Sequence, residues 1–368
     1  MPSLSVYDQK RELTDARAAN PWLAEGSSSV QQQALFDLDR AFQNWWKNPG
    51  HFGRPTWRRA GVHEGFYIRD LKVRRLNRRW GEVAVPKTRW VRFRISRQFS
   101  DIERATSARV TLDRAGRWHV SVTTPPPAFE RAATGAMVGL DMGIAASVTT
   151  SNGEHLEMPA LLSRGEAQRK RRLQRKMARQ AKGSNGWECT KAALAKLSAK
   201  EADRRKDWIE KTTTELVIDH DVIVVEDLRV KNMVRSAKGT NEAPGTRVTQ
   251  KRGLNRSIHN QAWALFRRRL EDKATHATSS VEIILVNPAF TSLRCSACGH
   301  VSAKNRKSQA VFRCRACDDT ANADVNAACN ILAAELAVTG RGGTPHATAS
   351  KPKHSGPAKR QPPVLVAA

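Results

Sequence analysis

The feature that most constrains this chain is a set of four cysteines in two short pairs, Cys295-Ser-Ala-Cys298 and Cys314-Arg-Ala-Cys317. Two residues between the members of a pair let both thiolates reach one tetrahedral ion, at about 2.3 Å. Residues 299–313 separate the pairs, a spacing that favours a zinc ribbon over a redox motif. Four thiolates complete the coordination, so the sequence predicts one structural Zn²⁺ on Cys295, Cys298, Cys314 and Cys317.

The charge balance indicates the kind of partner. Of 368 residues, 63 are Lys or Arg and 35 are Asp or Glu, which gives a formal net charge of +28. Such an excess favours nucleic acid, because each neutralised phosphate releases a condensed counterion. A ribosomal type of structural protein, or an ordinary highly charged surface, would show the same balance. The hydrophobic fraction of 40% allows packed cores, and the length suggests two or three domains.

The sequence predicts a cytoplasmic location without a membrane anchor. No segment approaches the roughly 20 apolar residues that a membrane span requires. The N-terminus lacks a basic start followed by an apolar stretch, so we expect no secretory signal. The paired cysteines, with Cys189 and Cys329 standing alone, suit a reducing compartment and a metal rather than a disulfide framework.

The first third of the chain predicts a helix and then strands. Residues 30–46 repeat apolar side chains at helical spacing, which we interpret as a packed helix face. Between residues 60 and 125 the period becomes two, and apolar residues alternate with arginines at 89–96. A small barrel with a cationic side that meets phosphates would show this pattern, and so would an ordinary solvated sheet face.

The rest of the chain predicts strands interleaved with helices. Strands are expected at 137–141, 145–150, 222–225 and 283–286. Residues 162–206 form a long helical pattern rich in Arg and Lys, broken at 182–186, which predicts a helical hairpin. Residues 235–257 are expected to be a mobile polar loop, whose position over the site the sequence leaves open, and 258–276 an amphipathic helix.

Three acidic residues stand where apolar segments end or begin. Asp141 and Glu226 each close an apolar strand, and Asp324 begins a helix. A carboxylate in such a place is costly unless something neutralises it. Magnesium prefers hard oxygen ligands, and two ions about 4 Å apart can activate water and stabilise a leaving oxygen.

Each acid taken alone has another interpretation, as a helix cap or a solvated strand end. Three neighbouring acids compete for the same role and rank lower: Asp227, Asp318 and Asp319.

Four blocks of the sequence resemble the TnpB (OrfB) family, insertion-sequence-encoded proteins related to the type V CRISPR effectors. They read VGLDMGIAASVTTSNG, VIVVEDLRVKNM, NPAFTSLRCSACGH and CRACDDTANADVNAACNIL. The basic helical stretch between the first two blocks resembles the family's helical pair. The first half of the chain resembles its recognition helices and wedge-type barrel.

The resemblance implies an α+β, multidomain fold. Its expected parts are a partial helical recognition region (1–52), a β-barrel wedge-like domain (53–130), a split RNase H/RuvC-like α/β nuclease core (131–292 and 319–338) with a basic helical hairpin at 162–207, an inserted zinc ribbon (293–318) and a disordered basic tail (339–368). The resemblance also implies a strand and a helix upstream of Met1, so the barrel is expected to expose an unpaired edge. A start codon placed too late and a decayed gene copy both remain open.

The resemblance further implies an RNA-guided DNA endonuclease of the prokaryotic cytoplasm and nucleoid. Its partners would be a guide RNA from the element's own end and double-stranded DNA with a short motif beside the target. Asp141, Glu226 and Asp324 match the three acids that would hold two catalytic Mg²⁺ ions. Two alternatives stay open: an RNA-guided binding protein that cannot cut, and a strand-transferring transposase.

Overall fold

The computed structural model describes residues 5–57, 61, 64–126 and 128–339. The basic tail predicted at 339–368 therefore lies, apart from Thr339, outside the described residues. The chain divides into two compact units, and each is described by itself. Of the described residues, the first unit contains those within 5–125 and 166–199, and the second contains those within 126–165 and 200–339.

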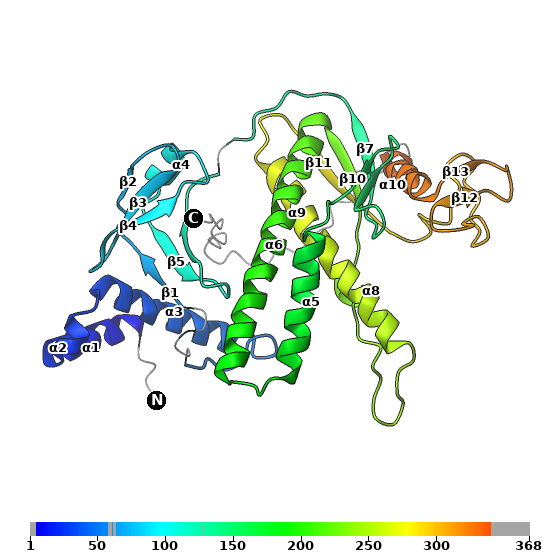
Figure 1. The fold of residues 1–368 in the computed structure, drawn as a ribbon. Helices are drawn as coiled ribbons and strands as arrows, with labels where there is room; N and C mark the ends of the chain where they lie inside the picture. Colours follow the sequence, from blue (N-terminus) through cyan, green and yellow to red (C-terminus); the bar gives the residue numbers. More distant parts are fainter. Residues whose placement is uncertain (1–4, 58–60, 62–63, 127, 340–368) are drawn as a thin grey trace. The chain divides into compact units, whose positions relative to one another are not determined.

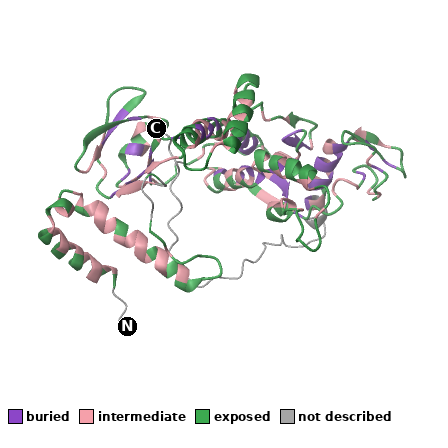
Figure 2. Ribbon diagram, turned by 60° about the horizontal axis from the view of Figure 1, so that its bottom comes forward, coloured by how far each residue is buried: buried purple, intermediate pink, exposed green. Residues whose placement is uncertain are grey.

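The first unit begins with the helices α1 (Val6–Ala19), α2 (Pro21–Ala24) and α3 (Ser28–Lys47). Ser5 and Asp8 form a capping box that satisfies free N–H groups at the start of α1. The helix predicted at residues 30–46 is confirmed by α3. However, neither α1 nor α3 contains a buried residue, and both lack purple in Figure 2. The apolar stripe of α3 is thus only half-buried.

Two three-stranded antiparallel sheets follow in the same unit. One has the order β1-β5-β6, from β1 (Gly65–Ile68), β5 (Ala108–Leu112) and β6 (Trp118–Val122). The other has the order β2-β3-β4, from β2 (Val73–Arg75), β3 (Trp80–Val85) and β4 (Arg89–Arg94), and a short helix α4 (Phe99–Glu103) follows it. Ile68, Val83 and Phe93 lie in one core, and the β4 arginines are exposed, as the alternation predicts, but Val91, which was expected on the apolar face, is exposed as well. Closure of these strands into a barrel stays a prediction.

Two helices lie where the basic helical pattern predicts them, α5 (Arg164–Arg179) and α6 (Asn185–Asp219). Residues 185–199 of α6 belong to the first unit, and residues 200–219 belong to the second. In the second unit, Ile209 and Val217 of α6 are fully buried in the core.

A mixed five-stranded sheet forms the centre of the second unit. Its order is β11-β10-β7-β8-β9. The strands are β7 (Met137–Asp141), β8 (Val148–Thr150), β9 (His155–Leu156), β10 (Val222–Glu226) and β11 (Glu282–Val286). β7, β10 and β11 run parallel to one another, whereas β8 pairs antiparallel with both β7 and β9.

Helices cover both faces of this sheet (Figure 1). Side chains alternate between the faces of a strand. Ile223 and Val225 of β10 therefore pack with Phe266 and Leu270 of α9 (Trp263–Thr275) on one face. Val224 packs instead with Ile331 of α10 (Ala323–Thr339) on the other. α10 is thus the helix that covers the face toward which even-numbered residues of β10 point.

Two predictions about the segment before α9 were wrong. The polar loop was expected to run to residue 257, but helix α8 (Val248–Gln261) begins ten residues earlier, after the short α7 (Val230–Met233). The single helix expected at 258–276 is two helices, because Ala262 adopts a left-handed conformation with φ of 55° and separates α8 from α9. Ile258 is the only buried residue of α8. The sequence of this helix therefore shows little of the apolar periodicity from which a helix is predicted.

A small two-stranded hairpin precedes α10. It joins β12 (Val311–Arg313) and β13 (Thr320–Asn322) in antiparallel register. Asn322 ends β13, and its side-chain oxygen accepts hydrogen bonds from the N–H groups of Asp324 and Val325 at the start of α10. Among the described residues, no helix is both long and apolar enough to cross a membrane.

Candidate functional site

Asp141 and Glu226 lie at the carboxyl ends of neighbouring parallel strands. The register pairs Leu140 of β7 with Val225 of β10, so the two acids are adjacent at the same edge of the sheet. Asp141 shares the orientation of Gly139, and Glu226 that of Val224, which packs toward α10. Both carboxylates therefore belong to the face that α10 covers.

Gly139 allows α10 to approach this face closely. A Cβ atom at Gly139 would lie 2.3 Å from the carbonyl oxygen of Ala328 and 2.8 Å from the amide nitrogen of Leu332. No side chain fits at such distances, so the strand can carry only glycine here without moving the helix. This contact fixes α10 against β7, and Asp324 lies in the first turn of that helix.

The electrostatics of Asp141 show that the three predicted acids lie near one another. Burial is the largest cause that raises the pKa of Asp141 from 3.8 to about 7, and the negative charges of Glu226 and Asp324 contribute to the same rise. Burial also raises the pKa of Glu226. Glu226 is buried and Asp141 and Asp324 are half-buried, and carboxylates gathered in this way are a donor set that suits a hard divalent cation such as Mg²⁺. The structure thus brings together acids that are far apart in the sequence.

Two residues that the sequence analysis missed contact these acids. Arg306 donates a hydrogen bond of 3.0 Å to Asp324, and its charge lowers the pKa of Asp141. The hydroxyl of Thr291 donates a 2.6 Å hydrogen bond to Oε1 of Glu226, which offsets part of the rise that burial causes in the pKa of Glu226. Both residues come from the segment around the cysteines, for which the only sequence signal is proximity to the Cys pairs.

The three rival acids are engaged elsewhere. Asp227 is exposed and forms an ion pair of 2.8 Å with Arg267. Asp318 is exposed and pairs with Arg313. Asp319 lies at the cysteine cluster, where its carbonyl accepts a hydrogen bond from the N–H of Cys314. None of them appears among the charges that shift the pKa of Asp141.

The four predicted cysteines converge on one point. Their sulfur atoms all lie within 4.8 Å of one another, with 3.8 Å between Cys295 and Cys317 and 3.5 Å between Cys298 and Cys314. A tetrahedron of thiolates at about 2.3 Å from zinc has edges of about 3.8 Å, so the cluster fits this ion. Among the described residues, this is the one group of three or more such ligands packed so tightly. The three carboxylates are therefore spaced more widely than the cysteines.

Two buried asparagines, also missed in the sequence, connect the cysteine segment to α10. Asn326 donates to the carbonyl of Arg294 and accepts from the N–H of Ser296. Asn330, one helical turn later, donates to the carbonyls of Thr291 and Arg294. Because Thr291 contacts Glu226, the cluster, α10 and the acids form one connected structure.

The fold and site define an α+β protein in which a mixed sheet presents clustered carboxylates beside a four-cysteine cluster. The OrfB_IS605 family, described as "Probable transposase", matches residues 119–237. The "Cas12f1-like, TNB domain" family matches residues 263–331.

Named relatives extend these matches over most of the chain. An Escherichia coli (strain K12) protein named as an RNA-guided DNA endonuclease, InsQ, is 39% identical over 320 residues, 86% of this chain and 77% of that protein. A Streptomyces pristinaespiralis protein, also named as an RNA-guided DNA endonuclease, is 33% identical and matches 87% of this chain and 75% of its own length. This chain belongs to the OrfB (TnpB) family of such proteins, which is related to Cas12f.

Among solved structures, the cryo-EM structure of a Cas12f1–sgRNA–target DNA complex matches with a TM-score of 0.49 and 14% identity. The match covers 83% of this chain and 70% of that one.

Proposed function

We propose that this chain is an RNA-guided DNA endonuclease that hydrolyses phosphodiesters at a site formed by Asp141, Glu226 and Asp324. The observation that carries the proposal is the electrostatic coupling of the half-buried Asp141 to Glu226 and Asp324. Membership of a family whose relatives are named as RNA-guided DNA endonucleases supports it.

We further propose that the second unit is a split RNase H/RuvC-like core. Its sheet has three antiparallel strands, β9, β8 and β7, continued by the parallel strands β10 and β11. The first two acids end the two central strands, and the third arrives on a helix after an inserted cysteine segment. This arrangement supports the core that the family resemblance implies.

Asp141, Glu226 and Asp324 would hold two Mg²⁺ ions, which supply an activated water and stabilise the leaving oxygen when bound. Two ions would be held by different subsets of the three acids, so the wide spacing of the trio is compatible with this proposal. Thr291 orients Glu226 through its hydrogen bond, and Arg306 neutralises part of the charge on Asp324. One Zn²⁺ on the four cysteines would stabilise the segment that carries both residues.

The partners of the proposed enzyme are a guide RNA and a double-stranded DNA target. The net charge of +28 suits two polyanions, and base pairing rather than protein contacts would read the target sequence. The cationic outer face of β4 and the basic helix α5 supply Arg and Lys in the first unit.

The test is cleavage of a supercoiled plasmid by the chain purified together with RNA from the end of its own element. With Mg²⁺ present, we expect nicked and linear products only from a plasmid that matches the RNA. Asp141→Ala should abolish them, and Asp227→Ala, which changes the rival acid, should retain them. Cutting without added metal, or cutting unchanged in Asp141→Ala, would refute the proposal.

A second candidate is a strand-transferring transposase, favoured by the description of the matching OrfB_IS605 family. It would use the same acids but would join the cut ends to a second DNA. Gel analysis of joined against free ends separates the two activities. A third candidate, a guided binding protein that cannot cut, requires a defective site, and the presence of all three acids weighs against it.

A further inference from the structure

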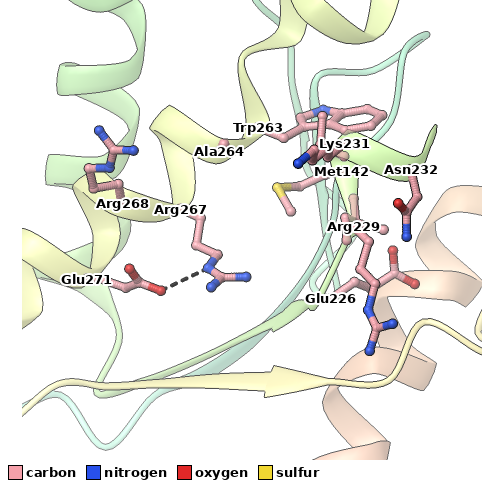
Figure 3. A pocket seen from close by; sticks show the side chains of 12 residues that line it. Met142, Glu226, Arg229, Lys231, Asn232, Trp263, Ala264, Arg267, Arg268 and Glu271 are labelled. Atoms are coloured by element: carbon pink, nitrogen blue, oxygen red, sulfur yellow. Dashed lines mark hydrogen bonds and ion pairs between the residues drawn. The ribbon is translucent and has the colours of Figure 1, made fainter. Parts of the chain in front are cut away.

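A cavity of about 530 Å³ opens beside Glu226 in the second unit (Figure 3). One side consists of the segment that follows β10, including Arg229 and Lys231. The other side consists of the first turns of α9, including Trp263 and Arg268. Its volume lies in the range of small-ligand sites. The cavity thus adjoins the proposed cutting site and shares Glu226 with it, whereas its other lining residues lie outside that site.

The cavity has more positively than negatively charged residues, and most of its cations have no acidic partner among the residues that the structure describes. Four cations line it, against the two carboxylates of Glu226 and Glu271. Arg267 is engaged, because it forms ion pairs with Asp227 and Glu271 at 2.8 and 2.9 Å. The other three cations are exposed and have no ion pair or side-chain hydrogen bond within the described part of the chain: Arg229, Lys231 and Arg268. Three free donors around one cavity suit a phosphate group.

The wall beside these cations is apolar and contains one unused donor. Met142 and Trp263 are both buried and both line the cavity. The indole N–H of Trp263 is buried, and it has no hydrogen-bond partner among the described residues. Trp263 itself is only 5% exposed. A buried polar group without a partner is costly, and a ligand at the cavity wall would supply the missing acceptor.

We propose that this cavity binds one nucleotide of the DNA strand that is cut, the one next to the bond held at the acid site. Its phosphate would contact Arg229, Lys231 and Arg268, and its sugar and base would lie against the wall of Met142 and Trp263. The proposal rests on the proposed function and adds a subsite to it. The proposal explains why three cations without acidic partners in the described chain, Arg229, Lys231 and Arg268, line a cavity. The proposed catalytic residue Glu226 lines the same cavity.

The test uses a small probe, thymidine 3′,5′-bisphosphate. A single nucleotide fits one cavity and contacts few of the other basic residues on the surface. Isothermal titration calorimetry of the full chain, with no magnesium added, should show one binding site. Changing Arg229, Lys231 and Arg268 together to Gln should weaken binding at least about tenfold, since three charge-assisted contacts are lost. The matched control removes equal charge from α5 by changing Arg171, Arg172 and Arg175 to Gln, and should change binding less than about twofold.

Trp263→Phe provides a second measurement, because it keeps an aromatic ring and removes the N–H. It should weaken binding of the bisphosphate several-fold while the protein stays folded. Binding that is equally weak in the cavity variant and the α5 control would overturn the proposal. Inorganic phosphate binding as tightly as the nucleotide would also overturn it, because the cavity would then recognise only an anion.

These outcomes are separate from those of the cleavage assay. A chain that binds the probe through the cavity cations but never cuts matched DNA would refute the endonuclease and leave nucleotide recognition standing. A chain that cuts matched DNA but binds the probe equally in both triple variants would refute the cavity and leave the endonuclease standing.

Discussion

Arg306 of the cysteine segment donates a 3.0 Å hydrogen bond to the carboxylate of Asp324, the third proposed metal ligand. A cation at this position competes with a metal ion for the same oxygen and opposes its charge. The relationship couples the cysteine segment to the acid site directly, in addition to the backbone contacts of Asn326 and Asn330.

Removing this competing cation should tighten metal binding. We expect Arg306→Gln to lower the Kd for Mn²⁺ by about threefold to tenfold, measured by electron paramagnetic resonance at about pH 8.5, above the pKa of Asp141. Arg313→Gln, which removes a charge paired with Asp318 in the same segment, is the control and should leave the Kd unchanged. Weaker binding in Arg306→Gln would show that the guanidinium supports the site rather than competing for it.

Asp141 should destabilise the metal-free protein at neutral and higher pH. Its pKa rises from 3.8 to about 7 on folding, so the unfolded chain releases this proton first and stability falls as pH rises between those values. The full penalty, about 4 kcal/mol, applies above pH 7. Asp141→Asn removes it, so this variant should unfold at a higher temperature than the wild type at pH 8 and at a similar temperature at about pH 4.

Thermal unfolding without added magnesium checks this prediction. Added Mg²⁺ should then raise the Tm of the wild type but not that of Asp141→Asn. Asp227→Asn, which changes an exposed and paired acid, should not gain stability at either pH. A variant Asp141→Asn that is less stable than the wild type at pH 8 contradicts the raised pKa.

The four cysteines should bind about one zinc ion per chain. Cys314→Ser removes a fully buried ligand and should abolish zinc in elemental analysis of the purified protein. Cleavage should also fall, because the segment that carries Thr291 and Arg306 loses its anchor. Cys189→Ser, an exposed cysteine outside the cluster, should keep both zinc and cleavage. Retention of a full zinc equivalent in Cys314→Ser would contradict the assignment.

Gly139 should tolerate no side chain. Gly139→Ala places a methyl group 2.3 Å from the Ala328 carbonyl of α10, and we expect a loss of about 1–3 kcal/mol in the free energy of unfolding. Gly165→Ala in α5 is the matched control, since nothing lies within 4 Å of its Cβ position, and it should be neutral or slightly stabilising. Denaturant unfolding measures both, and equal stability of the two variants would show that α10 does not press on the strand.

Local signals in the sequence predicted the cysteine cluster and the strand ends. Cysteine spacing determines which thiolates can share an ion, and the short run Val222–Val225, which is apolar and β-branched, favours the buried strand that is observed. The helix α8 was missed for the opposite reason. Its side chains are mostly exposed, so the sequence between residues 248 and 257 lacks an apolar period.

Contacts between residues of different elements could not be predicted from the sequence. Thr291, Arg306, Asn326 and Asn330 have no motif of their own, and their partners come from other elements. The left-handed conformation of Ala262 had no signal in the sequence either, because alanine favours helix. The order of the strands in the sheet was likewise absent from any local pattern.

The most direct test of the central claim, that three distant acids form one ion-binding cluster, is the Mn²⁺ titration of single variants. Asp141→Asn, Glu226→Gln and Asp324→Asn should each weaken binding by at least about tenfold, because each removes one charged ligand from the same site. Asp227→Asn and Asp319→Asn should bind like the wild type. Wild-type affinity in any of the first three variants would contradict the account.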